Sequence, residues 1–277
     1  MFITRFAPSP TGPLHLGHAF SALLAYDMAR TKNGTFLLRI DDLDQNRSRP
    51  EWEAQIYDDL TWLGLSWPSP VLRQSTRLPR YLAALETLWD QGLLYPCSCS
   101  RSDIRAAASA PQEGAPLHGP DGVIYPGTCR PATPPTGPMP RDTALRLDIA
   151  RACKTLDNPL TYNEKDETIA PQNLPATVGD VVLARRDMGA SYHLSVVLDD
   201  ADQQITHVIR GQDLQDATQI HVLLQRLLGL PTPAYHHHRL IRDDHGKRLA
   251  KRDDARAIAT YRAEGASPQD IRSLVGL

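Results

Sequence analysis

The chain has few aromatic residues, few cysteines and no long apolar run, and each shortage excludes a class of protein. Aromatic residues form 6% of the 277 residues, and there are four cysteines. No apolar stretch is long enough to cross a membrane, and the N-terminus lacks the charged-then-apolar pattern of a secretory signal. We therefore expect a cytoplasmic protein without membrane contact. In that compartment the cysteines bind a metal or are simply buried, rather than paired as disulfides.

The chain also lacks an excess of charge of either sign. Lys and Arg number 30 and Asp and Glu number 32, which gives a formal net charge of −2. This balance excludes a generally basic nucleic-acid-binding surface, although local basic patches can still attract a phosphate backbone. A hydrophobic content of 41% is ordinary for a globular protein of one large or two modest domains. No apolar stripe calls for a second copy, so we expect a monomer.

The first forty residues predict a βαβ unit. Residues 2–6 and 36–40 have the apolar character of short buried strands, and residues 17–30 between them show helical spacing of apolar side chains. Pro and Gly in residues 7–14 exclude regular structure there. A βαβ unit normally pairs its strands in parallel, and ligands bind at the carboxyl ends of the strands in such sheets. We therefore predict an α/β fold with a ligand site at this loop and at Asp41.

Two short motifs far apart in the sequence suggest a site for phosphate groups. Residues 15–18 read HLGH and place two imidazoles at the expected start of a helix, where free N–H groups and the helix dipole favour anions. Residues 247–252 read KRLAKR, and Lys247 and Lys251 could clamp a triphosphate. Two histidines at a turn and a solvated basic turn are the alternatives when each motif is taken alone. Together the motifs favour a site that handles the phosphates of ATP.

Residues 111–140 form an insertion that needs a cross-link to hold it together. Fourteen of these thirty residues are Pro or Gly, too many for helix or sheet. Cys97, Cys99 and Cys129 bracket the insertion, and a Zn²⁺ ion could tie the three thiols together. The C-x-C spacing is tighter than that of most zinc sites, so plain burial of small thiols stays open.

Five segments, taken in order, resemble the class I aminoacyl-tRNA synthetases, and most closely their glutamyl branch. They are residues 5–12 (RFAPSPTG), 15–18 (HLGH), 38–44 (LRIDDLD), 206–211 (THVIRG) and 247–252 (KRLAKR). The second and fifth correspond to the HIGH-type and KMSKS-type signatures of that class. The resemblance runs from about residue 2 to residue 255. It implies an α/β fold with a Rossmann-type parallel sheet, an inserted zinc-containing subdomain and a short helical C-terminal segment.

The resemblance also implies an order of domains. The catalytic domain would consist of two halves, residues 1–96 and residues 176–255, and the second half would carry the KMSKS-type loop. Between them, residues 97–175 would form the inserted subdomain that binds zinc and contacts the acceptor. Residues 256–277 would form the short helical C-terminus. Apart from the resemblance, Ser267 followed by Pro268 is a capping residue before a proline, which predicts the start of a last short helix.

By position, the resemblance implies residues for the two small substrates, ATP and L-glutamate. ATP would be bound by His15, Gly17, His18 and Lys251. Catalysis of attack by the glutamate carboxylate on the ATP α-phosphate would involve His15, His18, Lys247 and Lys251. Glutamate would be bound by Arg5, Ser9, Asp41, Tyr192 and Arg210. Mg²⁺ is expected to accompany the ATP.

The chemistry of these residue types suits an acidic amino acid. The forked donors of Arg5 and Arg210 match the two oxygens of a side-chain carboxylate, and Asp41 suits the α-ammonium group. Two positions depart from the family pattern. Asp41 stands where glutamate is common, and the second signature lacks its serine hydroxyl. Neither departure removes an essential charge, so we expect the chain to be active.

The short relatives within the glutamyl branch imply a particular zinc site. Cys97, Cys99, Tyr125 and Cys129 would together hold one structural Zn²⁺. A phenolate is a rare zinc ligand, so His118 in the same insertion stays open as the fourth ligand.

The place where the sequence ends favours one activity within the branch. It ends at Leu277 with one short helix, where glutamyl-tRNA synthetases carry an anticodon-binding domain. The short relatives form glutamyl-adenylate without tRNA and then transfer glutamate to queuosine in the anticodon loop of tRNA(Asp). A truncated synthetase that charges a tRNA 3′ end is the first alternative. A non-catalytic paralogue that binds tRNA or a metabolite is the second, and the presence of both phosphate motifs argues against it.

Overall fold

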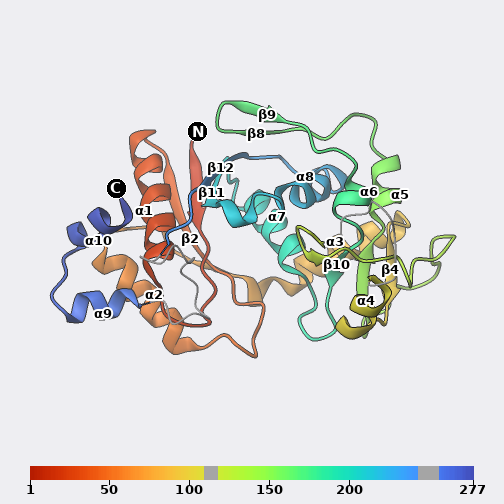
Figure 1. Cartoon of the computed structure of the whole chain (residues 1–277), viewed down its shortest axis with the longest axis horizontal. Helices are drawn as coiled ribbons and strands as arrows, with labels where there is room; N and C mark the ends of the chain where they lie inside the picture. Colours follow the sequence, from red (N-terminus) through yellow and green to blue (C-terminus); the bar gives the residue numbers. More distant parts are fainter. Residues whose placement is uncertain (109–117, 243–255) are drawn as a thin grey trace. The chain divides into compact units, whose positions relative to one another are not determined.

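The computed structural model describes residues 1–108, 118–242 and 256–277, and these divide into two compact units (Figure 1). Unit 1 comprises residues 1–76, 204–215 and 233–277, and unit 2 comprises residues 77–203 and 216–232. Each unit is therefore assembled from segments that are far apart in the sequence.

Unit 1 is built on parallel strands with helices around them. Its strands are β1 (Ile3–Phe6), β2 (Thr35–Ile40), β3 (Leu72–Arg73), β11 (His207–Gly211) and β12 (Ala234–His238). Its helices are α1 (Leu16–Thr31), α2 (Pro50–Trp62), α9 (Ile258–Ala263) and α10 (Pro268–Val275), with the 3-10 helix η2 (Gln212–Leu214). A second 3-10 helix, η1 (Gln74–Arg77), spans the sequence boundary between the units.

The strand pairing confirms the predicted βαβ unit. β1 pairs in parallel with β2, with Ile3 opposite Thr35, and α1 connects the two strands. β2 pairs in parallel with β3, and β11 pairs in parallel with β12. β11 also lies against β1, because the Thr206 N–H donates to the Ile3 carbonyl at 2.9 Å. Four of the five residues expected to bind glutamate, Arg5, Ser9, Asp41 and Arg210, lie at or just after the carboxyl ends of β1, β2 and β11.

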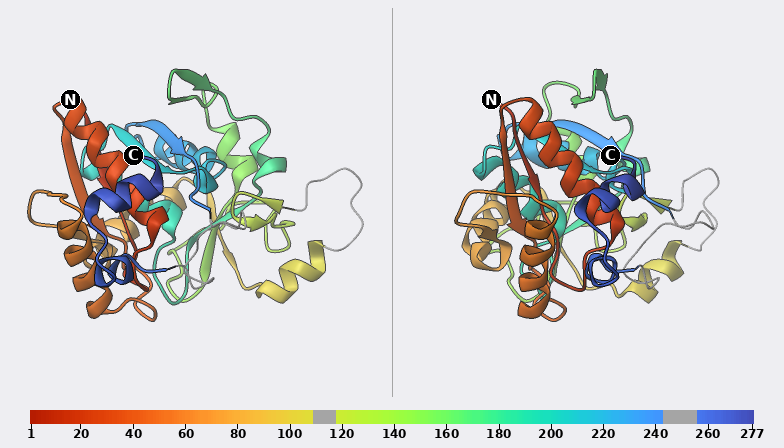
Figure 2. Two further views of the ribbon diagram at one scale, coloured as in Figure 1. Left: turned by 60° about the vertical axis from the view of Figure 1, so that its left-hand side comes forward. Right: turned by 90° about the vertical axis from the view of Figure 1, so that its left-hand side faces the viewer.

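The last two helices belong to the core of unit 1. Ile258, Ile271 and Val275 have no exposed surface and lie in the same apolar cluster as the buried face of α1. α10 packs against α1, and Figures 1 and 2 show the two helices side by side. Ser267 caps α10 and Pro268 occupies its first turn, as the sequence predicts.

Unit 2 holds an antiparallel sheet and several short elements. Its strands are β4 (Leu94–Cys97), β5 (His118–Gly119), β6 (Gly122–Val123), β7 (Ala144–Leu147), β8 (Tyr162–Glu164), β9 (Glu167–Ile169) and β10 (Val181–Ala184). Its helices are α3 (Leu78–Asp90), α4 (Arg101–Ala108), α5 (Ile149–Lys154), α6 (Leu174–Thr177), α7 (Tyr192–Asp202) and α8 (Thr218–Leu227). The antiparallel sheet has the order β10-β7-β4. The fold is thus α/β with mixed sheets, and the sequence predicted only its parallel part.

The Pro/Gly-rich insertion is mostly irregular where the structure describes it. It contains the hairpin β5-β6, whose strands are two residues long, and loops on either side. Among the helices of the described ranges, none has the length and apolar composition that a membrane span needs.

Candidate active site and cysteine cluster

The start of α1 is shaped by its own two histidines. His15 is the N-cap residue, and its Nδ1 accepts a hydrogen bond from the Gly17 N–H at 3.1 Å. The Nδ1 of His18 in turn accepts from the His15 N–H at 3.1 Å, which completes a capping box made of imidazoles. A Cβ at position 17 would lie 3.0 Å from the His15 ring, so glycine lets the ring fold over the backbone.

This arrangement fixes the protonation state of both rings. Each Nδ1 accepts a hydrogen bond, so each ring is neutral and carries its proton on Nε2. The two ring centres are 3.8 Å apart. His15 and His18 therefore present N–H donors beside a helix N-terminus, where backbone N–H groups and the helix dipole attract anions. The geometry suits the phosphate role expected from the sequence.

Two arginines lie on neighbouring strands of unit 1. Arg5 on β1 is 5% exposed and Arg210 on β11 is 6% exposed. The Arg210 Nε donates to the His237 Nε2 at 3.1 Å, and its guanidinium lies 5.3 Å from the centre of the Tyr235 ring. Buried guanidinium groups on adjacent strands create a positive, poorly hydrated site of the kind that binds a carboxylate.

Asp41 has a partner that the motifs did not predict. The Nε of Arg39 donates to Asp41 Oδ1 at 2.7 Å, and the Arg39 side chain has no exposed surface. The Asp41 N–H donates to the Pro8 carbonyl at 3.0 Å, which holds the loop carrying Ser9 against the end of β2. A signal was present in the sequence, because residues two apart on a strand point to the same face.

The other two acidic residues of the 41–44 segment have structural roles. Asp42 is 7% exposed and accepts hydrogen bonds from the backbone N–H of Ser75 at 2.8 Å and from its hydroxyl at 2.6 Å. Asp44 pairs with Arg47, whose hydrogen bond lowers the pKa of that carboxyl. Asp41 is therefore the carboxylate of this segment that is best placed to meet a substrate.

Of the remaining predicted residues, one lies in unit 2 and two lie outside the described residues. Tyr192 is the first residue of α7 in unit 2, where it is 37% exposed and its ring lies near those of His193 and His221. Lys247 and Lys251 lie outside the described residues. The chain that follows them returns to the first motif, because the Ile258 N–H donates to the Leu14 carbonyl at 2.8 Å.

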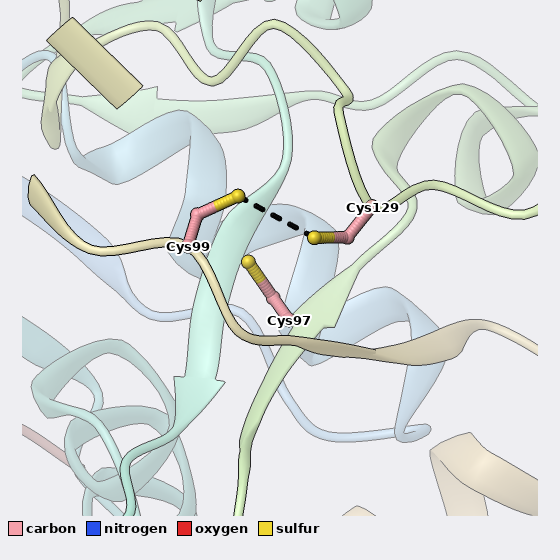
Figure 3. Close-up of side chains that lie close together, drawn as sticks. All are labelled: Cys97, Cys99 and Cys129. Atoms are coloured by element: carbon pink, nitrogen blue, oxygen red, sulfur yellow. Dashed lines mark hydrogen bonds between the residues drawn. The ribbon is translucent and has the colours of Figure 1, made fainter. Parts of the chain in front are cut away.

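The cysteine cluster lies in unit 2 and brings together the residues predicted around the insertion. Cys97 ends β4, Cys99 follows it, and Cys129 comes from the loop after β6 (Figure 3). Their sulfur atoms all lie within 4.8 Å of one another, and the Cys99 and Cys129 sulfurs are 3.4 Å apart. A tetrahedral zinc site with Zn–S bonds of about 2.3 Å places its sulfurs about 3.8 Å apart. The three thiols therefore fit a metal of this kind.

Tyr125 is the fourth group at the cluster. Its hydroxyl oxygen lies 3.5 Å from the Cys97 sulfur and 3.4 Å from the Cys99 sulfur, and it accepts from the Cys129 N–H at 2.8 Å. A hydrogen bond from this hydroxyl, opposed by burial, lowers the pKa of the Cys129 thiol to about 6, which favours the thiolate that metals bind. His118 is exposed and does not belong to the group of potential ligands found among the described residues.

Arg146 supports the cluster from the neighbouring strand. Its Nε donates to the Cys97 sulfur at 3.2 Å, and its guanidinium lies 3.8 Å from the centre of the Tyr125 ring. A positive charge beside a thiolate stabilises the thiolate form. This residue carried no signal in the sequence, because only the pairing of β4 with β7 places it opposite Tyr95.

A class I synthetase is defined by three features of this chain taken together, namely the fold, the start of α1 that suits anions, and the order of the motifs. The comparison of the sequence with known protein families agrees. The family described as tRNA synthetases class I (E and Q), catalytic domain, matches residues 1–277. The chain belongs to this family and is a class I aminoacyl-tRNA synthetase-like ligase.

The similar proteins have more specific names. The chain is 64% identical over 278 residues to a glutamyl-Q tRNA(Asp) synthetase of Rhodobacter capsulatus, a match that covers 99% of this chain and 100% of that protein. It is 43% identical over 287 residues to the glutamyl-Q tRNA(Asp) synthetase of Symbiobacterium thermophilum, covering 98% of this chain and 84% of that protein.

Solved structures with the same fold come from glutamate-specific synthetases. A glutamate tRNA ligase from Elizabethkingia meningosepticum, in complex with its amino acid, matches with a TM-score of 0.75 and 28% identity. A glutamate-tRNA synthetase from Elizabethkingia anophelis matches with a TM-score of 0.76 and 27% identity. Both matches cover the whole of this chain, which spans only 60% and 61% of those two chains.

Proposed function

We propose that this protein activates L-glutamate with ATP without needing tRNA, and then transfers the glutamate to queuosine in the anticodon loop of tRNA(Asp). The observation that carries the proposal is the 64% identity, over the full length of both chains, to a protein named for this substrate. The site in unit 1 supports the first half-reaction, because it combines buried arginines, a carboxylate and an anion-binding helix start.

Glutamate recognition rests on charge and on burial. Arg5 and Arg210 hold the side-chain carboxylate, while Asp41, steadied by Arg39, holds the α-ammonium group. Ser9 belongs to the same proposed set, whereas Tyr192, which the resemblance also implied, lies in unit 2. Glutamine would offer the arginines one acceptor oxygen in place of two. A buried donor left unpaired costs about 1–3 kcal/mol, which is enough to favour glutamate over its amide.

The activation step needs stabilisation of charge on the phosphates. An oxygen of the glutamate α-carboxylate attacks the ATP α-phosphorus, the bond to the bridging oxygen breaks, and pyrophosphate leaves. The Nε2–H groups of His15 and His18 donate to phosphate oxygens as their charge grows, with Gly17 giving the backbone close approach. Lys247 and Lys251 neutralise the departing pyrophosphate. Mg²⁺ bound with ATP would supply further neutralisation of the phosphates.

The cysteine cluster is the structural metal site of this proposal. Cys97, Cys99, Tyr125 and Cys129 would hold one Zn²⁺ per chain. Thiolates suit zinc, and the cluster links the end of β4 to a loop that is otherwise rich in Pro and Gly. We further propose that residues 97–175 act as the inserted subdomain that contacts the acceptor. Finally, we propose that the protein acts as a monomer in the cytoplasm, where its tRNA substrate is found.

The second candidate is a synthetase that charges a tRNA 3′ end. The likeness to solved glutamate-tRNA synthetases favours it, because the fold matches theirs over the whole chain. The two activities differ in the position of the new ester, which makes them separable by experiment.

The deciding experiment supplies labelled glutamate and ATP with tRNA from cells that make queuosine and from cells that do not. Label in queuosine-containing tRNA(Asp) alone supports the proposal. Equal labelling of both pools points to the 3′ end, and removal of the 3′-terminal adenosine of the tRNA, which takes away that acceptor, gives an independent check. Glutamate-dependent ATP–pyrophosphate exchange without tRNA tests the activation step, and its absence would favour a binding protein without catalysis.

A further inference from the structure

Helix α1 contacts the chain on both sides of the KRLAKR motif, residues 247–252. The motif itself lies outside the described residues, whereas β12 before it and α9 after it are described. On the α9 side, Ala257 forms an antiparallel bridge with His15, the first histidine of the HLGH motif. On the β12 side, the Ser21 hydroxyl lies 2.5 Å from the Nε2 of His238, the last residue of β12. One helix therefore begins at the first phosphate motif and also holds the described chain that flanks the second.

The hydrogen bonds of His238 fix its tautomer. Its Nδ1 lies 2.8 Å from the Arg239 carbonyl oxygen, which can only accept a hydrogen bond, so Nδ1 carries the proton. Burial lowers the pKa of His238, which favours the neutral ring, and in that ring Nε2 accepts from the Ser21 hydroxyl. The ring is 6% exposed and lies edge-on to the Phe20 ring, with 4.9 Å between the ring centres. Removing the hydroxyl therefore takes the donor away from a buried acceptor, where water is a poor replacement.

Arg239, the next residue, is held from two sides. Its Nη2 donates to the Val275 carbonyl at 2.5 Å, and its guanidinium lies 4.8 Å from the centre of the Phe20 ring. Val275 is the last residue of α10, where carbonyl groups lack partners within the helix and carry partial negative charge. Gly276 follows with a φ of 76°, and a Cβ at this position would lie 2.8 Å from the Arg239 Nη2. The end of α10 thus has the charge and the space that this arginine needs.

We infer that Ser21 and Arg239 are positioning residues for the activation of glutamate, because together they fix the point at which the chain leaves β12 toward the KRLAKR motif. Neither residue needs to touch ATP. Ser21 acts through His238, and Arg239 acts through Phe20 and the carboxyl end of α10. Both contacts hold the end of β12 against α1, which carries the HLGH motif at its start. The inference rests on the proposed function, because it takes the two motifs as partners in the phosphate chemistry.

The test measures glutamate-dependent ATP–pyrophosphate exchange in the S21A and R239M variants without tRNA. Misplacement of a catalytic group by about 1 Å can slow a reaction about a hundredfold. We therefore expect each variant to lower the kcat of exchange by about ten- to a hundredfold and to raise the KM for ATP. The KM for glutamate should be unchanged, because the proposed glutamate-binding residues of unit 1 lie at β1, β2 and β11 rather than at β12.

Conservative variants should restore the rate. S21T keeps the hydroxyl that donates to His238, and R239K keeps a cation that can donate to the Val275 carbonyl. Both should have a kcat within about threefold of wild type, because the hydrogen bond and not the exact side chain is what holds β12. Thermal melting of every variant sets an assay temperature at which all are folded.

Two matched controls remove similar contacts elsewhere in unit 1. S66A removes a serine hydroxyl that lies 3.2 Å from the hydroxyl of Tyr26, which is also on α1. R262M removes an exposed arginine that donates to Asp58 at 2.7 Å and lies 5.7 Å from the centre of the Trp62 ring. Neither contact involves β12, so both controls should keep the wild-type kcat and both KM values.

A double variant tests the link to the KRLAKR motif. If Ser21 acts through that motif, S21A/K251A should be about as slow as K251A alone, because the two losses are then not independent. Losses that multiply would instead give Ser21 a role separate from Lys251 and would overturn the inference.

Other outcomes also decide the question. A wild-type kcat in S21A and R239M, or an equal loss in S66A and R262M, would overturn the inference while leaving the proposed activation step intact. No exchange in wild type would refute the activation step and the inference together. Exchange by wild type without transfer of glutamate to queuosine would refute only the proposed acceptor, and the positioning roles measured by exchange would stand.

Discussion

Replacing Arg39 by methionine is expected to destabilise the protein by about 3–5 kcal/mol, because it removes the buried cation beside the carboxylate of Asp41. The Arg39 side chain has no exposed surface and that of Asp41 is 8% exposed, so water replaces little of the lost interaction. Whole domains have folding free energies of about 5–15 kcal/mol, so this is a large share of the total.

The same stretch of chain offers a matched control. Arg47 also pairs with an aspartate, Asp44, but 72% of the Arg47 side chain is exposed. Exposed ion pairs contribute about 0–1 kcal/mol, so R47M should be close to wild type in urea unfolding. The difference in unfolding free energy between R39M and R47M thus separates the effect of burial from the effect of removing an arginine.

Kinetics test the functional side of the same pair. We expect R39M, assayed at a temperature where it is folded, to raise the KM for glutamate and to leave the KM for ATP unchanged. A double-mutant cycle with D41N should give a coupling energy of about 0.5–3 kcal/mol. Equal stabilities of R39M and R47M, or a coupling energy of zero, would refute the reasoning that burial makes this pair strong.

Four further predictions concern other parts of the molecule. I271A opens a cavity between α10 and α1 and should lower the free energy of unfolding, measured in urea, by about 2–5 kcal/mol. L274A changes a side chain on the same helix that is 55% exposed, and should lower it by less than about 0.5 kcal/mol. Burial lowers the pKa of His238 below its usual 6.5, so the unfolded chain binds a proton there more readily than the folded chain does. The stability of the protein should therefore fall as the pH drops below 6.5. The H238Q variant should flatten that part of a plot of melting temperature against pH. Metal analysis should find about one zinc per chain in wild type and none in C99S, and a zinc-free wild type would contradict the site. K251A should slow pyrophosphate exchange sharply with an unchanged melting temperature, and unchanged exchange would remove the clamp role.

Local rules explain the parts of the fold that the sequence predicted. The βαβ unit and the Ser267-Pro268 start of α10 depend on residues within a few positions of one another, where periodicity and capping operate. The antiparallel sheet of unit 2 was not predicted. Its strands are four residues long, and their partners lie far away in the sequence.

The candidate site divides in a similar way. The residue types at the start of α1 suggested a phosphate site only together with the second motif, and the three cysteines around the insertion left plain burial open beside a metal site. Arg39 could have been found from its spacing to Asp41. Arg146 could not, because it reaches Cys97 only through the pairing of β7 with β4.

The sequence by itself determined the family, the local geometry of the HLGH motif and the set of side chains that could meet phosphate, carboxylate and metal. Only the tertiary structure decided how these side chains are combined. It buried the Arg39–Asp41 pair, placed α10 in the core with α1, and brought Arg101 and Arg185 to one cavity although they are far apart in the chain. The physical reason is range: capping and periodicity act over one turn or one strand, whereas burial and charge compensation depend on which distant segments pack together.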